Sequence, residues 1–354
     1  MAQAAGFGVG VPLNLVDQLL AGHRRGLARA ISLVEDDGPE AHALLAALYP
    51  HTGRGHVVGV TGAPGTGKST LVNALARAYR AQGFTVGIIA VDPTSPFSGG
   101  ALLGDRVRMR DLAGDPGVFI RSMATRGSLG GLARATADVI LVLDAAGFDR
   151  ILVETVGVGQ AEVEIASAAH TTIVVEAPGL GDEVQAIKAG VLEIADLFAV
   201  NKADREGADH AVLALQMMQG LAPAAARGPA PVGTGHHRPE RGRSAGHAEP
   251  GPQPDGAWLP PITKTVATRG EGVEVLRDWI EQHAGYLRET DQLARRETAR
   301  AASALNHILC DRLMDVLLTH LPEGRVTVFV ETIAHRDVDP YTAAAQLLSE
   351  AGLQ

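Results

Sequence analysis

The chain has 354 residues, of which 46% are hydrophobic but only 4% aromatic, so its core must consist mainly of aliphatic side chains, as in parallel sheets covered by helices. Its formal net charge of −9 argues against a nucleic-acid surface, since neutralising phosphates requires clustered Lys and Arg. The first residues lack the pattern of a signal peptide and no run reaches the ~20 apolar residues that span a bilayer, so we expect a cytoplasmic protein without a membrane partner.

The expected elements begin with helices over residues 13–49, where apolar residues recur at helical spacing and Gly38-Pro39 forms a break. From Val57 onward the pattern changes to short apolar runs separated by helix-length segments. This alternation predicts a mostly parallel sheet with helices on both faces. The strand-like runs are 57–60, 85–91, 118–122, 150–154, 171–175 and 197–201.

The second half of the chain begins with residues 220–256, which are rich in Pro, Gly, Ala and Arg. Their composition predicts a disordered surface insert, although a local change of reading frame would also produce it. Strand character returns at 261–267, and helical spacing runs from Val273 to about Leu321. The single cysteine, Cys310, falls in an apolar periodic part of that helix and is interpreted as a core residue.

The last elements are a strand predicted over 325–334 and a short helix beginning at Pro340, whose ring suits a first helical turn. We therefore expect three parts. Residues 1–55 form an N-terminal helical extension, residues 56–288 form the α/β domain, and residues 289–354 form a C-terminal helical extension suited to self-association.

The strongest motif is GAPGTGKST, which follows a predicted strand and opens a predicted helix, as the phosphate-binding P-loop requires. Its glycines let successive N–H groups turn toward the phosphates, while Lys68 reaches the β and γ oxygens and the hydroxyl of Ser69 can ligate Mg²⁺. The nucleotide-binding residues predicted here are Gly62, Ala63, Pro64, Gly65, Thr66, Gly67, Lys68, Ser69 and Thr70.

A second motif, Asn201-Lys202-Ala203-Asp204, ends the strand-like run 197–201. The carboxylate of Asp204 can accept hydrogen bonds from guanine N1–H and the exocyclic amino group. Adenine would leave that carboxylate unpaired, so the motif favours GTP over ATP. Backbone N–H groups of Thr265, Val266 and Ala267 are further candidates, for contact with guanine O6.

Acidic residues follow other strand-like runs. Asp92 ends the second run and Asp105 lies in the Gly-rich stretch after it, so either is suited to the Mg²⁺ shell or to orienting water. Glu154 ends the run 150–154, where a metal-linked acid is expected. Gly157 offers an N–H to the γ-phosphate, and Gln160 either orients a water or caps the next helix.

The segment 178–188 is glycine-hinged at its start and charged afterwards, which is typical of a mobile loop, although Asp182 would equally cap an ordinary helix there. The switch and partner-coupling residues predicted in this loop are Gly181, Asp182, Glu183, Gln185 and Lys188.

Taken together, these segments resemble the MeaB/ArgK family of GTPases, formerly described as LAO/AO transport ATPases. The resemblance runs through 62–70, 91–109, 121–133, 151–165, 178–204, 264–276 and 331–344, and the long segments are specific to that family. It departs from the family pattern between about Gly220 and Gly256.

This resemblance implies a P-loop G domain in a homodimer, with Mg²⁺ near Ser69, Asp105 and Glu154. It also implies that the loop from Pro178 to Lys188 reports the GTP or GDP state to methylmalonyl-CoA mutase. Family members gate adenosylcobalamin delivery to that mutase and help to protect or reactivate it.

Three alternatives remain. The mutase served could be another B12-dependent enzyme, such as isobutyryl-CoA mutase. A nickel-insertion GTPase would need clustered Cys or His ligands, which one cysteine and scattered histidines do not offer. A protein kinase would need an acceptor site beside the P-loop, and no sequence feature indicates one.

Overall fold

The computed structural model describes residues 13–92, 110–112, 114–124, 129–155, 168–179, 194–221, 250–253 and 256–353. The chain divides into two compact units, one ending at Leu293 and the other beginning at Ala294. Among the described helices, none combines the length and apolar composition needed to cross a membrane.

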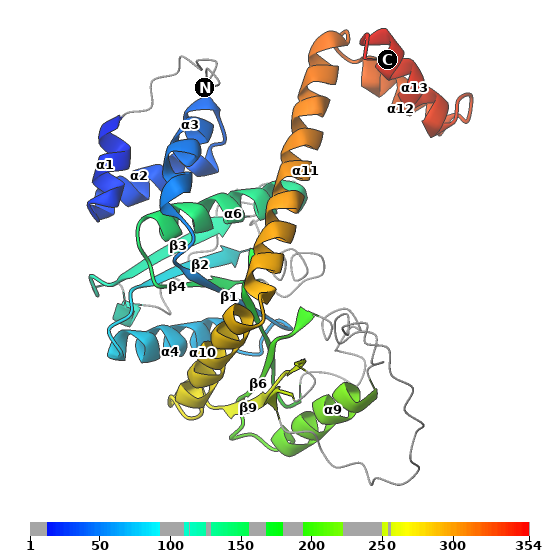
Figure 1. Ribbon diagram of the computed structural model, residues 1–354. Helices are drawn as coiled ribbons and strands as arrows, with labels where there is room; N and C mark the ends of the chain where they lie inside the picture. The colour runs from blue at the N-terminus through cyan, green and yellow to red at the C-terminus, as the bar shows by residue number, and fades with distance from the viewer. Residues whose placement is uncertain are drawn as a thin grey trace, which may run out of the picture. The chain divides into compact units, whose positions relative to one another are not determined.

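The first unit is organised around a seven-stranded sheet of order β3-β2-β4-β1-β5-β6-β9, in which every pair of neighbours is parallel (Figure 1). This confirms the predicted α/β fold. The strands are β1 His56–Thr61, β2 Val86–Asp92, β3 Val118–Ala124, β4 Arg150–Glu154, β5 Thr171–Glu176, β6 Leu197–Asn201 and β9 Ile262–Thr265. A parallel sheet of this kind places the carboxyl ends of all its strands along one edge.

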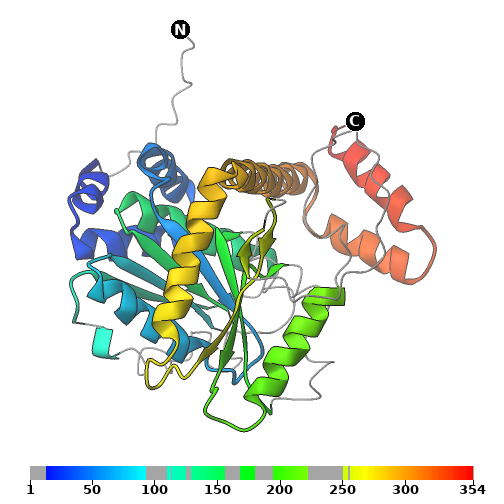
Figure 2. The same cartoon turned by 60° about the horizontal axis from the view of Figure 1, so that its bottom comes forward.

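Both faces of the sheet are buried because consecutive apolar residues point to opposite sides. In β1, Val57 joins the core formed with α2, α3 and α6, whereas Val58 and Val60 join the core formed with α4 and α10. Figure 2 shows α4 and α10 together on one face of the sheet. The covering helices are α1 Leu13–Leu20, α2 Arg24–Glu35, α3 Pro39–Leu48, α4 Lys68–Ala81, α6 Leu129–Ala145, α9 Ala208–Leu221 and α10 Val273–Glu289.

The N-terminal segment is helical, as the periodicity of residues 13–49 predicted, and the structure shows that these helices pack on the sheet. Buried residues such as Ile31 and Leu44 join the same core as Ile89 and Ile151 from the sheet. A short 3-10 helix, η1 Tyr49–His51, leads toward β1. The connection is held by Asp144 of α6, whose carboxylate accepts hydrogen bonds from three successive backbone N–H groups, those of residues 53, 54 and 55.

The predicted insert at 220–256 is only partly described. Helix α9 continues to Leu221, and β7 (Gly251–Pro252) pairs with β8 (Trp258–Leu259) in a small antiparallel ladder. Residues 222–249, on which most of that prediction falls, lie outside the described part. Strand β9 lies within the predicted 261–267 run and joins the sheet beside β6.

The second unit consists of helices, and one of them corrects a predicted strand. Residues 325–334 form α12 Arg325–Ala334, between α11 Gln292–His320 and α13 Pro340–Glu350. The alternating valines suggested a strand, but the described residues of this unit contain no strand with which 325–334 could pair. A helix satisfies its own backbone, and Phe329 is buried while Arg325 pairs with Glu350 of α13.

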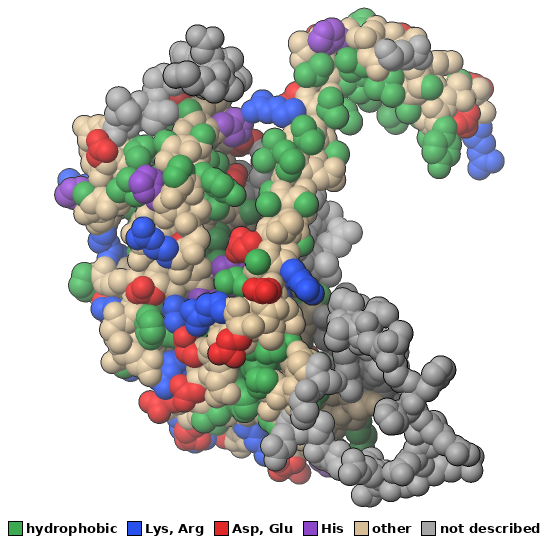
Figure 3. Space-filling model, in the orientation of Figure 1, with side chains coloured by type: hydrophobic (Ala, Val, Ile, Leu, Met, Phe, Trp, Pro, Cys, Tyr) green, Lys and Arg blue, Asp and Glu red, His purple; other side chains and the backbone are tan. Residues whose placement is uncertain are grey.

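The apolar run of α11 was expected to be buried and is instead exposed. Leu305, Leu309 and Leu313 expose 58%, 50% and 62% of their surface, and Cys310 is also exposed. The prediction that Cys310 is a core residue is therefore wrong for the single chain. Figure 3 shows hydrophobic side chains along α11 and the C-terminal helices.

Candidate functional site

The turn between β1 and α4 carries the GAPGTGKST motif at the carboxyl edge of the sheet. Gly62 and Gly67 have φ angles of 139° and 92°, which side-chain-bearing residues rarely adopt. A Cβ at Gly62 would overlap the carbonyl oxygen of Val175, and one at Gly67 would lie 2.5 Å from Asn201 Nδ2. Both glycines are therefore required by local geometry.

Lys68 is the first residue of α4, and its side chain turns back over this loop. Its Nζ donates hydrogen bonds to the carbonyl oxygens of Gly62 (2.8 Å) and Ala63 (3.1 Å). Lys68 is only 6% exposed, so its ammonium group is held at the loop rather than in solvent. The loop is further fixed by Thr66, whose hydroxyl donates to Ala63 O at 2.9 Å.

Ser69 and Glu154 meet across the same edge. The hydroxyl of Ser69 donates to Glu154 Oε1 at 2.6 Å, and Glu154, at the end of β4, is 5% exposed. Next to it, the Thr155 hydroxyl donates to Thr61 Oγ1 at 3.0 Å. No motif indicates this Thr155–Thr61 contact, because it joins the ends of two strands that lie far apart along the chain.

Asn201 connects the P-loop to the end of β9. Its Nδ2 donates to Thr66 O at 2.9 Å, while its Oδ1 accepts from Thr265 Oγ1 at 3.2 Å and from Ala267 N at 3.1 Å. The side chain of Asn201 is buried, so these contacts satisfy a polar group that has lost its water. The following residue, Lys202, has a φ of 56° and donates from Nζ to Gly65 O at 2.6 Å.

Two of the amides predicted to contact a guanine O6 are engaged within the protein. Val266 N donates to Glu271 O at 3.0 Å, and Ala267 N donates to Asn201 Oδ1. In this conformation, therefore, Val266 and Ala267 stabilise the loop after β9, and contact with a base would have to share or replace these bonds.

Asp204 lies beyond Asn201 in the same loop and keeps 44% of its side chain exposed. Its Oδ2 lies 3.8 Å from Nη2 of Arg269, a residue that the motif analysis did not select. No motif marks Arg269, because its proximity to Asp204 arises from the parallel pairing of β6 with β9.

Comparisons with known proteins agree with this arrangement. Residues 27–321 match a family model described as methylmalonyl Co-A mutase-associated GTPase MeaB. The chain belongs to the MeaB family. It is 44% identical to a Pyrococcus abyssi protein named putative GTPase, over 95% of this chain and 96% of that protein.

Two further matches are a mitochondrial protein and a solved structure. A Caenorhabditis elegans protein named methylmalonic aciduria type A homolog, mitochondrial, is 38% identical over 54% of this chain and 52% of its own length. A crystal structure of LAO/AO transport system kinase matches with a TM-score of 0.66 and 25% identity, over 95% of this chain and 96% of that one. As a MeaB-family member, the chain is a P-loop GTPase that binds GTP and GDP.

The remaining predicted site residues fall into two groups. Asp92 ends β2 at the carboxyl edge of the sheet. Asp105, Gly157 and Gln160, together with the predicted switch residues Gly181, Asp182, Glu183, Gln185 and Lys188, lie outside the described residues.

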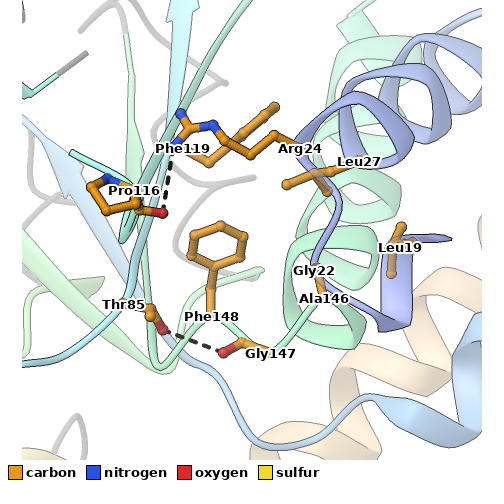
Figure 4. A pocket seen from close by; sticks show the side chains of 10 residues that line it. All are labelled: Leu19, Gly22, Arg24, Leu27, Thr85, Pro116, Phe119, Ala146, Gly147 and Phe148. Atoms are coloured by element: carbon orange, nitrogen blue, oxygen red, sulfur yellow. Dashed lines mark hydrogen bonds between the residues drawn. The ribbon is translucent and has the colours of Figure 1, made fainter. Parts of the chain in front are cut away.

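A separate cavity of about 170 Å³ lies among elements at the opposite edge of the sheet (Figure 4). It is lined largely by apolar side chains, including Leu27, Phe119 and Phe148, from α2, β3 and the loop before β4. Arg24 also lines it, but Nη1 of Arg24 donates to the carbonyl oxygens of Asp115 (3.0 Å) and Pro116 (3.4 Å). The cavity shares no residue with the P-loop.

Proposed function

We propose that this MeaB-family GTPase uses Mg²⁺ and GTP to gate adenosylcobalamin loading into methylmalonyl-CoA mutase, and to protect or reactivate that enzyme. The observation that carries the proposal is that the P-loop and the Ser69–Glu154 pair lie at one edge of the sheet, where Asn201 bonds the P-loop next to the loop that carries Asp204, in a chain of this family. The description of the family as associated with methylmalonyl-CoA mutase supports that enzyme as the partner.

Nucleotide recognition is assigned to two parts of the site. The ammonium group of Lys68 exchanges its carbonyl contacts for β- and γ-phosphate oxygens, while the N–H groups of the glycine-rich loop and the start of α4 surround the phosphates. Asp204 accepts from guanine N1–H and the exocyclic amino group. Asn201 hydrogen-bonds to the P-loop and to the loop after β9. We propose that it thereby couples phosphate binding at the P-loop to base binding at Asp204.

The residues present fit a magnesium ion. Mg²⁺ prefers oxygen ligands, and the hydroxyl of Ser69 and the carboxylate of Glu154 lie together at the sheet edge. When bound, the ion neutralises charge on the β- and γ-phosphates. We assign Ser69 and Glu154 to holding it, with Asp92 and Asp105 as candidates for the rest of its shell.

The state of the nucleotide is proposed to be relayed by the loop Pro178–Lys188, whose segment of the sequence comes after β5. Gly157 and Gln160 are proposed to sense the γ-phosphate and to orient water. The protein is proposed to act as a homodimer in the cytoplasm through its C-terminal helices.

The proposal is tested by measuring GTP hydrolysis with the purified protein alone and with methylmalonyl-CoA mutase, using ATP as the control substrate. We expect GTP turnover to exceed ATP turnover and to rise when the mutase is added. Isobutyryl-CoA mutase in a parallel assay identifies the alternative partner.

The outcomes separate the alternatives. Stimulation by isobutyryl-CoA mutase alone would keep the chaperone role and change its client. GTP turnover that responds to nickel but to neither mutase would favour a metal-insertion role. Turnover of ATP in preference to GTP would contradict the role of Asp204.

A further inference from the structure

The turn between β9 and α10 places Arg269 beside the base-recognition loop. Val266 and Glu271 form an antiparallel bridge in which Val266 N donates to Glu271 O at 3.0 Å, and Arg269 N donates to Val266 O at 2.9 Å. Gly272 closes the turn with a φ of 74°, and a Cβ there would overlap the carbonyl oxygen of Lys264. The backbone that carries Arg269 is therefore tightly defined.

The guanidinium of Arg269 contacts two carboxylates. Its Nε lies 2.9 Å from Glu271 Oε1, and its Nη2 lies 3.8 Å from Asp204 Oδ2. The shorter contact anchors the guanidinium to its own turn. The longer one brings positive charge to one oxygen of Asp204 without forming a direct hydrogen bond.

This arrangement matters because guanine must be read by both oxygens of Asp204 at once. An exposed carboxylate on its own rotates among several orientations, and only some present both oxygens to N1–H and the exocyclic amino group. A cation fixed beside one oxygen favours a subset of these orientations. The carboxylate then loses less conformational entropy when the base binds. Since Asp204 and Arg269 are both about half exposed, the effect should be modest.

We propose that Arg269 is a specificity-determining positioning residue, which orients Asp204 for guanine and is itself held by Glu271. This inference rests on the proposed role of Asp204 in base recognition. It predicts that Arg269 contributes more to the affinity for a base that donates two hydrogen bonds to Asp204 than to the affinity for a base that donates one.

The test compares dissociation constants for GTP and inosine triphosphate, which lacks the exocyclic amino group. We expect Arg269→Ala to weaken GTP binding about fivefold and inosine triphosphate binding less than about twofold, so that discrimination falls. Arg269→Lys should restore part of the GTP affinity because it keeps the charge. Glu271→Gln should lower discrimination in the same direction by releasing the anchor.

The controls separate this inference from the role of Asp204 itself. Arg205→Ala removes an exposed cation next to Asp204 in sequence and should leave discrimination unchanged. Asp204→Asn should shift preference from GTP to xanthosine triphosphate, whose donor pattern complements an amide. If Asp204→Asn shifts the preference but Arg269→Ala leaves the ratio unchanged or tightens GTP binding, the positioning role is wrong; if Asp204→Asn shifts nothing, base recognition by Asp204 is wrong.

Discussion

Lys68 is the first residue of α4, directly after the P-loop, and its ammonium group donates hydrogen bonds to carbonyl oxygens of that loop. We predict that Lys68→Ala abolishes tight nucleotide binding, weakening it about 100-fold or more, since a charge-assisted contact to phosphate is lost. Titration with a fluorescent GTP analogue measures this. Arg77→Ala, which removes an exposed cation from the same helix, should bind normally; equal losses in both variants would contradict a specific role for Lys68.

Glu154 supplies the negative charge beside the hydroxyl of Ser69. We predict that Glu154→Gln, which keeps the size of the side chain but removes its charge, raises the Mg²⁺ concentration for half-maximal GTP hydrolysis about tenfold. A magnesium titration of turnover checks this, with the exposed Glu206→Gln as the control. An unchanged magnesium requirement in Glu154→Gln would show that this carboxylate does not hold the metal.

At the scale of residues, the sequence could predict groups whose roles follow from a contiguous motif. Lys68, Ser69 and Asp204 were found in this way. It could not predict that Asn201 would bond to Thr66, 135 positions earlier, or that Arg269 would reach Asp204, because both contacts depend on which strands become neighbours.

At the scale of elements, a partly buried network of histidine and threonine side chains joins the starts of β1 and β5 to α10. His56 Nε2 lies 2.8 Å from Thr171 Oγ1, and Thr171 Oγ1 lies 2.9 Å from His283 Nδ1. His283 in turn lies 3.3 Å from Asp196. Burial first, and then the electrostatic effects of nearby His170 and of the Arg150 guanidinium, lower the pKa of His56 well below its usual value.

This lowered pKa predicts acid sensitivity. In the unfolded chain His56 regains its ordinary pKa of about 6.5, so below that pH the unfolded chain binds a proton that the folded chain does not bind. The stability that depends on this difference is therefore present above about pH 6.5 and is lost progressively as the pH falls below it. We expect the free energy of unfolding to fall by about 1 kcal/mol more in the wild type than in His56→Gln between pH 7 and pH 5.5. Urea unfolding at both pH values measures this, and equal losses in the two proteins would refute it.

The elements also show where sequence patterns fail. The strand prediction for 325–334 relied on alternating valines, yet a strand needs a neighbour, and the described residues of that unit provide a helical partner instead. The six runs from 57 to 201 had parallel neighbours available, and there the same pattern gave the right element.

At the scale of the whole molecule, the parallel sheet could be predicted from alternating strands and helices. What the C-terminal helices pack against could not be predicted in this way. Helical spacing in α11 indicates an apolar face without indicating what covers it. The single chain leaves that face exposed over Leu305, Leu309 and Leu313. Exposed apolar surface of this kind is typical of association sites.

We predict that this face is covered by a second copy of the chain. The wild type should then elute with twice the monomer mass of 36.8 kDa in size-exclusion chromatography with light scattering. Leu309→Glu combined with Leu313→Glu should raise the dimer dissociation constant at least about 100-fold, because two apolar contacts are lost and two charges would be buried. Met217→Glu, at an exposed apolar position on α9, is the matched control and should remain dimeric. A monomeric wild type would contradict the dimer, whereas a dimeric double variant would place the interface on another surface.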